Sequence, residues 1–246
     1  MSEKPTIMVD TFARAAARAP GRNSYKGLAI HALPGLHEFI ADKASDFLAP
    51  GSRVLDVAAG SGALCQRLLD AGFCMSAIDY VRENFRLDSV PFRQADLNQS
   101  FASTCAERYQ GIIACEIIEH LENPRHLARE CFELLEPGGR LLLTTPNVDS
   151  ASSKASFLRF GTFYWFDDAR YRIDGHITPI TQWQIDKAFT EAGFTFLWRG
   201  SFGDPLRLTV GSPRLRLVAI AISLATRQNS RLGGEIFVAV LEKPRS

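Results

Sequence analysis

The feature that most restricts the fold of this chain is an alternation of short apolar strands and helices over residues 51–146. The segments "RVLDVA", "FCMSAID", "PFRQAD", "YQGIIAC" and "RLLLTTP" have the length and apolar content of strands. Between them, "ALCQRLLDA" and "PRHLARECFELL" have helical periodicity and end at glycine or Pro-Gly. Strands that alternate with helices in this way predict a doubly wound α/β fold, with a parallel sheet covered on both faces.

Segments on both sides extend this pattern. The spacing of apolar residues predicts a helix from Leu36, which Pro50-Gly51 stops. Further along, "TQWQIDKAFTEA" predicts a helix, and "FTFLWRGSF" and "GGEIFVAVLEK" predict two more strands. We therefore expect an N-terminal helical extension at residues 1–50, where "DTFARAAARA" is compatible with a basic helix, and one main domain at residues 51–246.

Composition and charge argue against several classes of protein. The formal net charge of +1 gives no global field for nucleic acid. The five cysteines are scattered without a CxxC pair, which fits reduced thiols in a cytoplasm. The N-terminus has no uninterrupted apolar segment typical of a signal peptide, and no apolar stretch approaches the length of a membrane span. We expect a cytoplasmic protein, whose oligomeric state the sequence does not set.

A glycine-rich turn follows the first strand of the main domain. In "VLDVAAGSGAL", Gly60 and Gly62 let the backbone turn sharply and let a ligand approach closely. Asp56 lies in this strand, Asp79 ends the next strand and Asp96 ends the third. An acid in the position of Asp79 suits hydrogen bonds to ribose hydroxyls. The carboxyl ends of parallel strands share one edge, so a nucleoside site is predicted there, with an ordinary strand-to-helix turn as the alternative.

Five motifs together resemble those of a known family. They are "LDVAAGSG", "AIDY", "ADL", "IIACEIIEHLENP" and "LLEPGGRLLLTTPN". On these motifs the chain resembles the class I S-adenosylmethionine-dependent methyltransferases over residues 54–240. The resemblance implies a seven-stranded, mostly parallel Rossmann-like sheet with an antiparallel last strand, and S-adenosylmethionine as the cofactor. It also implies cofactor contacts at ten positions, namely Asp56, Ala58, Ala59, Gly60, Gly62, Asp79, Tyr80, Asp96, Leu97 and Cys115.

The resemblance divides the cofactor among these positions. The turn from Asp56 to Gly62 would line the methionine part, Asp79 would bind the ribose, and Asp96 and Leu97 would contact the adenine. Ala58 stands where the family usually has its first glycine, a position at which alanine often substitutes.

Three other functions compete with methyl transfer to a small molecule. A dinucleotide-binding oxidoreductase is disfavoured because Leu64 and Cys65 follow Gly62 where a third glycine belongs. An RNA 2′-O-methyltransferase is disfavoured by the near-zero net charge. A non-catalytic cofactor-binding protein is disfavoured by the retained Asp79 and Gly60.

Groups that can move protons or bind a metal follow the fourth strand in "ACEIIEHLENP". Glu116, Glu119 and His120 would lie on one face if a helical turn began there, and His176 follows a long loop. Together these four residues resemble the metal site of the small-RNA 2′-O-methyltransferases and the ubiquinone-pathway O-methyltransferases. They predict a site for magnesium, manganese or iron.

The same residues allow two interpretations without a metal. His120, Glu119 and His176 could act as catalytic acid–base or substrate-contacting groups, because a hydroxyl acceptor must lose its proton. Alternatively, they could have a structural role, either by a favourable interaction with a helix terminus or by packing in the core. O-methylation is the predicted reaction. The other histidines are expected at the surface or in the core, namely His31, His37 and His126.

Two segments carry further predictions. Residues 148–180 are expected to form a substrate cap, in which seven aromatic side chains would exclude water or merely pin the loop. They are Phe157, Phe160, Phe163, Tyr164, Trp165, Phe166 and Tyr171. Residues 204–233 form an insertion whose five arginines flank "LVAIAISLA", with no acid between Asp204 and Glu235. Peripheral membrane contact through residues 207–231 is one prediction, and burial against a partner subunit or over the sheet is the other. The expected acceptor is a small molecule, a glycan or a lipid-linked molecule.

Overall fold

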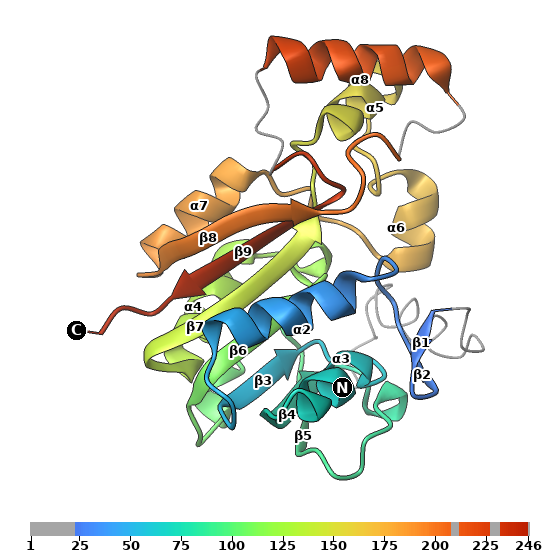
Figure 1. The fold of residues 1–246 in the computed structure, drawn as a ribbon. Coiled ribbons are helices and arrows are strands. Elements are labelled where there is room, and N and C mark those ends of the chain that lie inside the picture. Colours follow the sequence, from blue (N-terminus) through green and yellow to red (C-terminus); the bar gives the residue numbers. More distant parts are fainter. Residues whose placement is uncertain (1–22, 208–211, 227–231, 246) are drawn as a thin grey trace, which may run out of the picture.

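A twisted seven-stranded sheet with helices on both faces forms the body of the protein (Figure 1). The structure, a computed structural model, describes residues 23–207, 212–226 and 232–245. The strands lie in the order β5-β4-β3-β6-β7-β9-β8. Their bounds are β3 Arg53–Val57, β4 Cys74–Asp79, β5 Phe92–Gln94, β6 Tyr109–Cys115, β7 Leu135–Pro146, β8 Thr195–Phe202 and β9 Ile236–Glu242.

The pairing of the strands confirms the fold class predicted from the sequence. β3 is parallel to β4 and β6, β4 to β5, and β6 to β7, whereas β9 is antiparallel to both β7 and β8. The carboxyl ends of β3, β4, β5 and β6 therefore meet at one edge of the sheet, where ligands bind in open α/β folds.

Two helical layers cover the faces of this sheet. The α-helices of the described residues, some of which lie outside these layers, are α2 Leu36–Phe47, α3 Ala63–Asp70, α4 Pro124–Leu134, α5 Ala151–Phe160, α6 Asp168–Asp174, α7 Gln182–Glu191 and α8 Pro213–Ala225. α4 and α7 bury their apolar faces in one core cluster, and α2 and α3 bury theirs in another. Neighbouring residues of one strand belong to opposite clusters, as Ile112 and Ile113 of β6 do, because side chains alternate between the faces of a strand.

The N-terminal segment is not wholly helical in its described part. A two-stranded hairpin, β1 Ser24–Tyr25 and β2 Leu28–Ala29, precedes α2. The hydroxyl of Ser61 donates to the carbonyl of Ala29, which fixes this segment beside the glycine-rich turn. The predicted basic helix in "DTFARAAARA" lies outside the described residues.

The segment after β7 contains two helices that the sequence pattern did not show. α5 buries small residues such as Ala151, Ser152 and Ala155, so its buried face lacks the large apolar residues that reveal a helix. α6 has only seven residues, and none of them is buried. The apolar stretch of the arginine-flanked insertion forms the helix α8. Among the described residues, no helix is both long and apolar enough to cross a membrane.

Candidate active site

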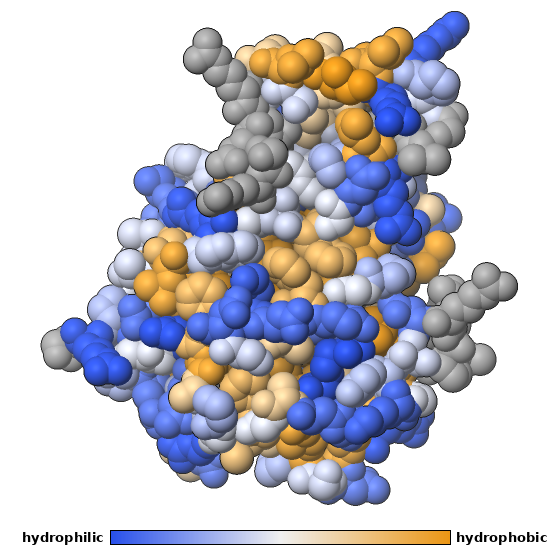
Figure 2. All heavy atoms as spheres, in the orientation of Figure 1, coloured by the Kyte–Doolittle hydropathy of each residue, from blue (hydrophilic) through white to orange (hydrophobic). Residues whose placement is uncertain are grey.

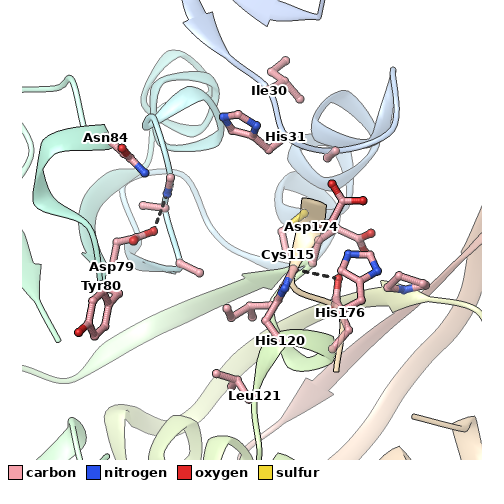
Figure 3. A pocket seen from close by; sticks show the side chains of 18 of the residues that line it. Ile30, His31, Asp79, Tyr80, Asn84, Cys115, His120, Leu121, Asp174 and His176 are labelled. Atoms are coloured by element: carbon pink, nitrogen blue, oxygen red, sulfur yellow. Dashed lines mark hydrogen bonds and ion pairs between the residues drawn. The ribbon is translucent and has the colours of Figure 1, made fainter. Parts of the chain in front are cut away.

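A cavity of about 610 Å³ opens at the carboxyl edge of the sheet. This volume is in the range of small-molecule sites. One side, here called the turn-side wall, consists of residues that end β3, β4 and β5, namely Ala58, Ala59, Gly60, Asp79, Tyr80, Asp96 and Leu97. The other side, here called the histidine-side wall, is formed by His37, Glu116, Glu119, His120, Trp165 and His176. Figure 3 shows Asp79 and Tyr80 across the cavity from His120 and His176, with Cys115 nearer the histidines.

Hydrogen bonds lock the turn-side wall to the end of β4. The amide of Gly60 donates to Oδ2 of Asp79 at 2.8 Å, and the amide of Val81 donates to Oδ1 at 2.9 Å. Burial raises the pKa of Asp79, and these amide hydrogen bonds oppose that rise. Ala58 has a positive φ of 68°, a conformation that glycine adopts more easily. The alanine in place of the usual glycine therefore keeps the turn at the cost of local backbone strain.

Eight of the ten predicted cofactor contacts line the cavity, and Asp56 and Gly62 do not. Asp56 is 1% exposed, and the Cys65 thiol donates to its carboxyl at 3.3 Å. Burial raises the pKa of Asp56 to about 7. Gly62 has a φ of 89°, and a Cβ there would lie 3.0 Å from the side chain of Leu87. Both residues shape the turn from outside the cavity, and their direct contact with the cofactor stays a prediction.

Backbone hydrogen bonds bring the two parts of the histidine-side wall together. The carbonyl of Glu119, in the 3-10 turn Ile118–His120, accepts from the amides of Ile177 and Thr178 at 3.0 and 2.9 Å. The segment that carries His176 is therefore held against this turn. The rings of His120 and His176 lie edge to face with centroids 4.8 Å apart.

His120 and His176 are held in the same tautomer. Nδ1 of His120 lies 3.2 Å from the carbonyl oxygen of Gly175, and Nδ1 of His176 lies 2.8 Å from that of Trp165. A carbonyl oxygen can only accept, so each Nδ1 carries the proton and each Nε2 keeps a lone pair. Burial lowers the pKa of His120 to about 3, with a contribution from His176, and burial also lowers the pKa of His176. Both rings are therefore neutral at pH 7.

Two carboxyl groups lie on the same wall, that of the buried Glu119 and that of the partly buried Glu116. Oε2 of Glu119 accepts from the Thr145 hydroxyl at 3.0 Å, and Oε1 of Glu116 accepts from the Thr144 hydroxyl at 2.8 Å. Burial raises the pKa of Glu119 well above its ordinary value, and the neighbouring Glu116 adds to the rise. Burial raises the pKa of Glu116 to about 7. This wall therefore favours protonated carboxyl groups unless a positive charge enters it.

Three of the four predicted metal ligands form a group that could hold an ion. One ligand atom each of Glu119, His120 and His176 lies within 4.8 Å of the others. Glu116 is not in this group, so its part in the set of four stays a prediction. The helical turn that would have aligned Glu116 does not form, because Glu116 has a positive φ of 53° and the 3-10 turn begins at Ile118. Neutral imidazoles with fixed Nδ1 protons and a carboxyl group suit a divalent cation.

Polar atoms without a partner mark where a ligand would bind. Among the described residues, buried side-chain atoms that lack a hydrogen-bond partner include Nδ1 of His37, Oε1 of Glu119 and Nε1 of Trp165, and all three residues line the cavity. His37 is buried, as expected, and burial lowers its pKa to about 4. Its position at the cavity is new, because no sequence motif surrounds it. His31, expected at the surface or in the core, also lines the cavity.

The aromatic residues of the cap do not form one wall. Of the seven singled out in the sequence, Trp165 lines the cavity. Phe157 and Phe163 instead stack on each other, with ring centroids 4.7 Å apart. Arg170, another cavity residue, lies over the Trp165 ring at 4.6 Å. The segment thus both contributes to the cavity and forms a local aromatic cluster, and its role as a substrate cap stays a prediction.

Comparison with known proteins agrees with this arrangement. Residues 29–197 match the family described as Methyltransferase domain. The chain is 30% identical over 158 residues to the ubiquinone biosynthesis O-methyltransferase of Psychrobacter arcticus, a match that covers 59% of this chain and 60% of that protein. It is 31% identical over 132 residues to the protein of the same name from Xanthomonas campestris, with 50% and 54% covered. The chain therefore spans about half to three fifths of the length of these curated relatives.

Solved structures share the fold. The N-methyltransferase NodS of Bradyrhizobium japonicum superposes with a TM-score of 0.60 at 15% identity, covering 98% of this chain and all of that one. A SAM-dependent methyltransferase of Archaeoglobus fulgidus gives a TM-score of 0.59 at 16% identity, with 84% and 94% covered. A doubly wound sheet with an antiparallel strand β9 and a cavity at its carboxyl edge is the architecture of a methyltransferase. The chain belongs to the Methyltransferase domain family, which confirms the family resemblance found in its motifs.

Proposed function

We propose that this protein transfers a methyl group from S-adenosylmethionine to a hydroxyl oxygen. The observation that carries the proposal is one cavity that joins a locked glycine turn and Asp79 to the neutral His120 and His176. The names of the partially covered relatives support an oxygen acceptor. The acceptor is proposed to be a small molecule, including a glycan or lipid-linked one.

The turn-side wall would bind the cofactor. The turn residues Ala58, Ala59 and Gly60 would meet the methionine part, because this backbone allows close approach. The Asp79 carboxylate would accept hydrogen bonds from the ribose hydroxyls, and Asp96 with Leu97 would contact the adenine. Tyr80 and Cys115 would complete the contact surface.

The histidine-side wall would bind the acceptor and take its proton. The Nε2 lone pairs of His120 and His176 would accept hydrogen bonds from hydroxyl groups and so orient the attacking oxygen toward the methyl group. The oxygen forms a bond to the methyl carbon as the carbon–sulfur bond breaks, which leaves S-adenosylhomocysteine and a methyl ether. The hydroxyl proton would pass to Glu119, whose raised pKa makes its ionised form a stronger base than an ordinary carboxylate.

A divalent cation is the second proposal for the same wall, and it rests on the grouping of Glu119, His120 and His176. A cation held by these residues would supply Lewis acidity that lowers the pKa of an acceptor hydroxyl. Titration of Mn²⁺ into the protein, followed by electron paramagnetic resonance, tests this directly. His176→Phe should weaken Mn²⁺ binding at least tenfold, as loss of one ligand implies. His31→Phe, which changes another cavity histidine outside the group, should leave it unchanged.

Calorimetry with S-adenosylmethionine tests the main proposal first. Folded protein that gives no binding heat and no thermal stabilisation with this cofactor would falsify it. Activity is then measured as S-adenosylhomocysteine release with catechols, phenols and sugars as acceptors. If the enzyme methylated nitrogen or carbon and gave no product with any hydroxyl, the proposed hydroxyl acceptor would be wrong.

The location of the protein is part of this proposal. We infer a cytoplasmic protein that contacts a membrane peripherally through the arginine-flanked insertion at residues 207–231. Of this insertion, Arg227 and Arg231 lie outside the described residues. α8 and its packing are described, and they carry the next inference.

A further inference from the structure

α5 and α8 form a helical pair apart from the two main cores. Their contact is a small buried cluster of Ala151, Ala155, Leu215 and Ala219. Figure 1 shows the pair at the top of the molecule, beyond the end of the sheet, with α8 outermost. The outer face of α8 is therefore not covered by other described parts of the chain.

The outer face of α8 is apolar. Leu215, Ala219 and Ile222 face α5, whereas Leu217, Ile220 and Leu224 recur at helical spacing on the exposed side. Leu217 is 68% exposed and Leu224 is 75% exposed. A surface helix normally exposes polar residues to water, whereas α8 exposes apolar ones.

α5 continues the apolar surface. Phe157, Leu158 and Phe160 at its C-terminal end are 46%, 72% and 62% exposed. Figure 2 shows apolar residues gathered over the helical pair at the top of the molecule. We call the exposed apolar side chains of the two helices the α5–α8 surface, which consists of Phe157, Leu158, Phe160, Leu217, Val218, Ile220 and Leu224.

The charges within this helical pair have a single sign. α5 carries Lys154 and Arg159, α8 carries Arg214 and Arg216, and neither helix contains an acid. Within the described ranges, Lys154 has an acidic group within 4 Å, whereas the three arginines form no such pair. Their positive charges therefore remain available to an outside anion.

We propose that the α5–α8 surface docks on an anionic lipid bilayer, with α8 lying in the plane of the interface. A helix of 13 residues is about 20 Å long, shorter than the ~30 Å hydrocarbon layer, so it can lie on a bilayer but not span it. Its leucines would enter the boundary between headgroups and acyl chains, while the arginines would reach lipid phosphates. This inference deepens the membrane contact proposed above and does not depend on methyl transfer.

The charges favour a bilayer over a second copy of the chain. A two-fold contact would place this surface against itself, so its three arginines would meet those of the partner copy, and neither helix has an acid to pair with them. An anionic bilayer instead supplies phosphates to every arginine.

Docking would also place the cavity near the membrane. The chain runs from the C-terminal end of α5 directly to Trp165, and α6 follows with Arg170 and Asp174, all of which line the cavity. A molecule that partitions into the bilayer would then reach the histidine-side wall with a short path through water.

Sedimentation of the full chain with phosphatidylcholine vesicles, with and without phosphatidylglycerol, tests the proposal. We expect binding to the anionic vesicles that weakens with salt. Leu217→Gln with Leu224→Gln should lower the partition coefficient at least tenfold, because two exposed apolar side chains are lost. Arg214→Gln with Arg216→Gln should lower it about tenfold or more for anionic vesicles and little for neutral ones.

Matched variants distinguish docking through this surface from non-specific binding to vesicles. Trp183→Gln removes an apolar side chain that is also 68% exposed, but on α7. Arg86→Gln with Arg129→Gln removes two exposed charges elsewhere. Both controls should bind vesicles like the wild type. Thermal unfolding and S-adenosylmethionine affinity, measured on every variant, should stay unchanged, which keeps a failure of docking distinct from a failure of the proposed enzyme function.

Three outcomes would overturn docking on lipid. The first is that folded wild-type protein does not bind anionic vesicles at low salt. The second is a loss of vesicle binding in the Trp183 control equal to that in the leucine variant. The third is a dimer in analytical ultracentrifugation that the leucine variant dissociates, which would assign the surface to a second copy of the chain.

Discussion

The two walls of the cavity differ in how their polar groups are satisfied. On the turn-side wall, the Asp79 carboxylate already accepts hydrogen bonds from two backbone amides. On the histidine-side wall, Glu119 has a buried oxygen without a hydrogen-bond partner in the described structure, and His37 and Trp165 each have a nitrogen without one. A buried polar atom without a partner costs free energy. The carboxylate of the first wall is therefore partnered before a ligand arrives, whereas a ligand would supply partners to polar atoms of the second wall.

This difference suggests a division of labour. A wall whose hydrogen bonds are already formed is preorganised and binds a common cofactor with little rearrangement. A wall with unpaired groups and shifted pKa values is the kind of place where catalysis and acceptor choice occur. The predictions below test whether binding and turnover separate in this way.

The largest effect is expected from Glu119→Gln. Loss of the proposed base should lower kcat for the best hydroxyl acceptor by roughly 10²–10⁴-fold. Calorimetry should show an affinity for S-adenosylmethionine within about threefold of the wild type, because Glu119 is not part of the turn-side wall. Equal losses in affinity and kcat would show that the walls do not act separately.

The pH dependence of kcat gives an independent view of the same residue. Only the ionised carboxylate can take a proton, and burial raises the pKa of Glu119 well above its ordinary value. The rate should therefore rise as the pH increases through that raised pKa and then level off. Glu119→Gln should remove the rise, and a flat profile in the wild type would assign the base to another group.

The buried Asp56, behind the turn-side wall, should make the stability of the protein depend on pH. Burial raises its folded-state pKa to about 7 from 3.8, so the folded state holds a proton that the unfolded state releases. Stability should fall as the pH rises from about 4 to 7, and the whole cost is present above pH 7. Asp56→Asn removes this cost and should be more stable than the wild type by roughly 2–4 kcal/mol at pH 8, with no such gain at pH 4.

Urea denaturation at each pH measures this difference. Asp88→Asn, at an exposed position outside the cavity, is the matched control and should follow the wild type at every pH. A constant difference between Asp56→Asn and the wild type from pH 4 to 8 would mean that Asp56 does not titrate in this range.

The fold and the turn-side wall were predictable because their signals are local. The strand–turn–helix sequence around Gly60 and the acid that ends β4 lie in motifs with fixed spacing, and pairing of parallel strands then brings Asp79 to Gly60. Spacing could not show that Asp56 and Gly62 lie outside the cavity lining, because it does not tell which way a residue of the turn faces.

The histidine-side wall was only partly predictable because tertiary contacts assemble it. His120 and His176 were identified from residue type, but their contact depends on backbone hydrogen bonds between Glu119 and residues 177 and 178. The left-handed backbone of Glu116 and the cavity position of His37 have no signature in the sequence. The small residues of α5 also hid a helix, because hydrophobic periodicity needs large side chains.

Asp79→Asn should reverse the pattern expected for Glu119. Asparagine keeps one acceptor oxygen but loses the charge and one of the two amide hydrogen bonds. The dissociation constant for S-adenosylmethionine should rise about 100-fold, consistent with the loss of a charged hydrogen bond. Measured at saturating cofactor, kcat should change much less. An unchanged dissociation constant in calorimetry would place the ribose elsewhere.

The smallest effect is expected at Gly62, and it tests whether the turn needs glycine for its backbone or for its space. Gly62 and Gly72 have nearly the same φ, 89° and 90°, but a Cβ at Gly62 would meet Leu87 and Phe85, whereas nothing lies within 4 Å of one at Gly72. Gly72→Ala should cost about 1 kcal/mol of unfolding free energy from backbone strain alone. Gly62→Ala should cost about 1 kcal/mol more, because Leu87 must shift. Equal losses for the two variants in urea denaturation would mean that this side of the turn has room to spare, and that backbone conformation alone accounts for the glycine.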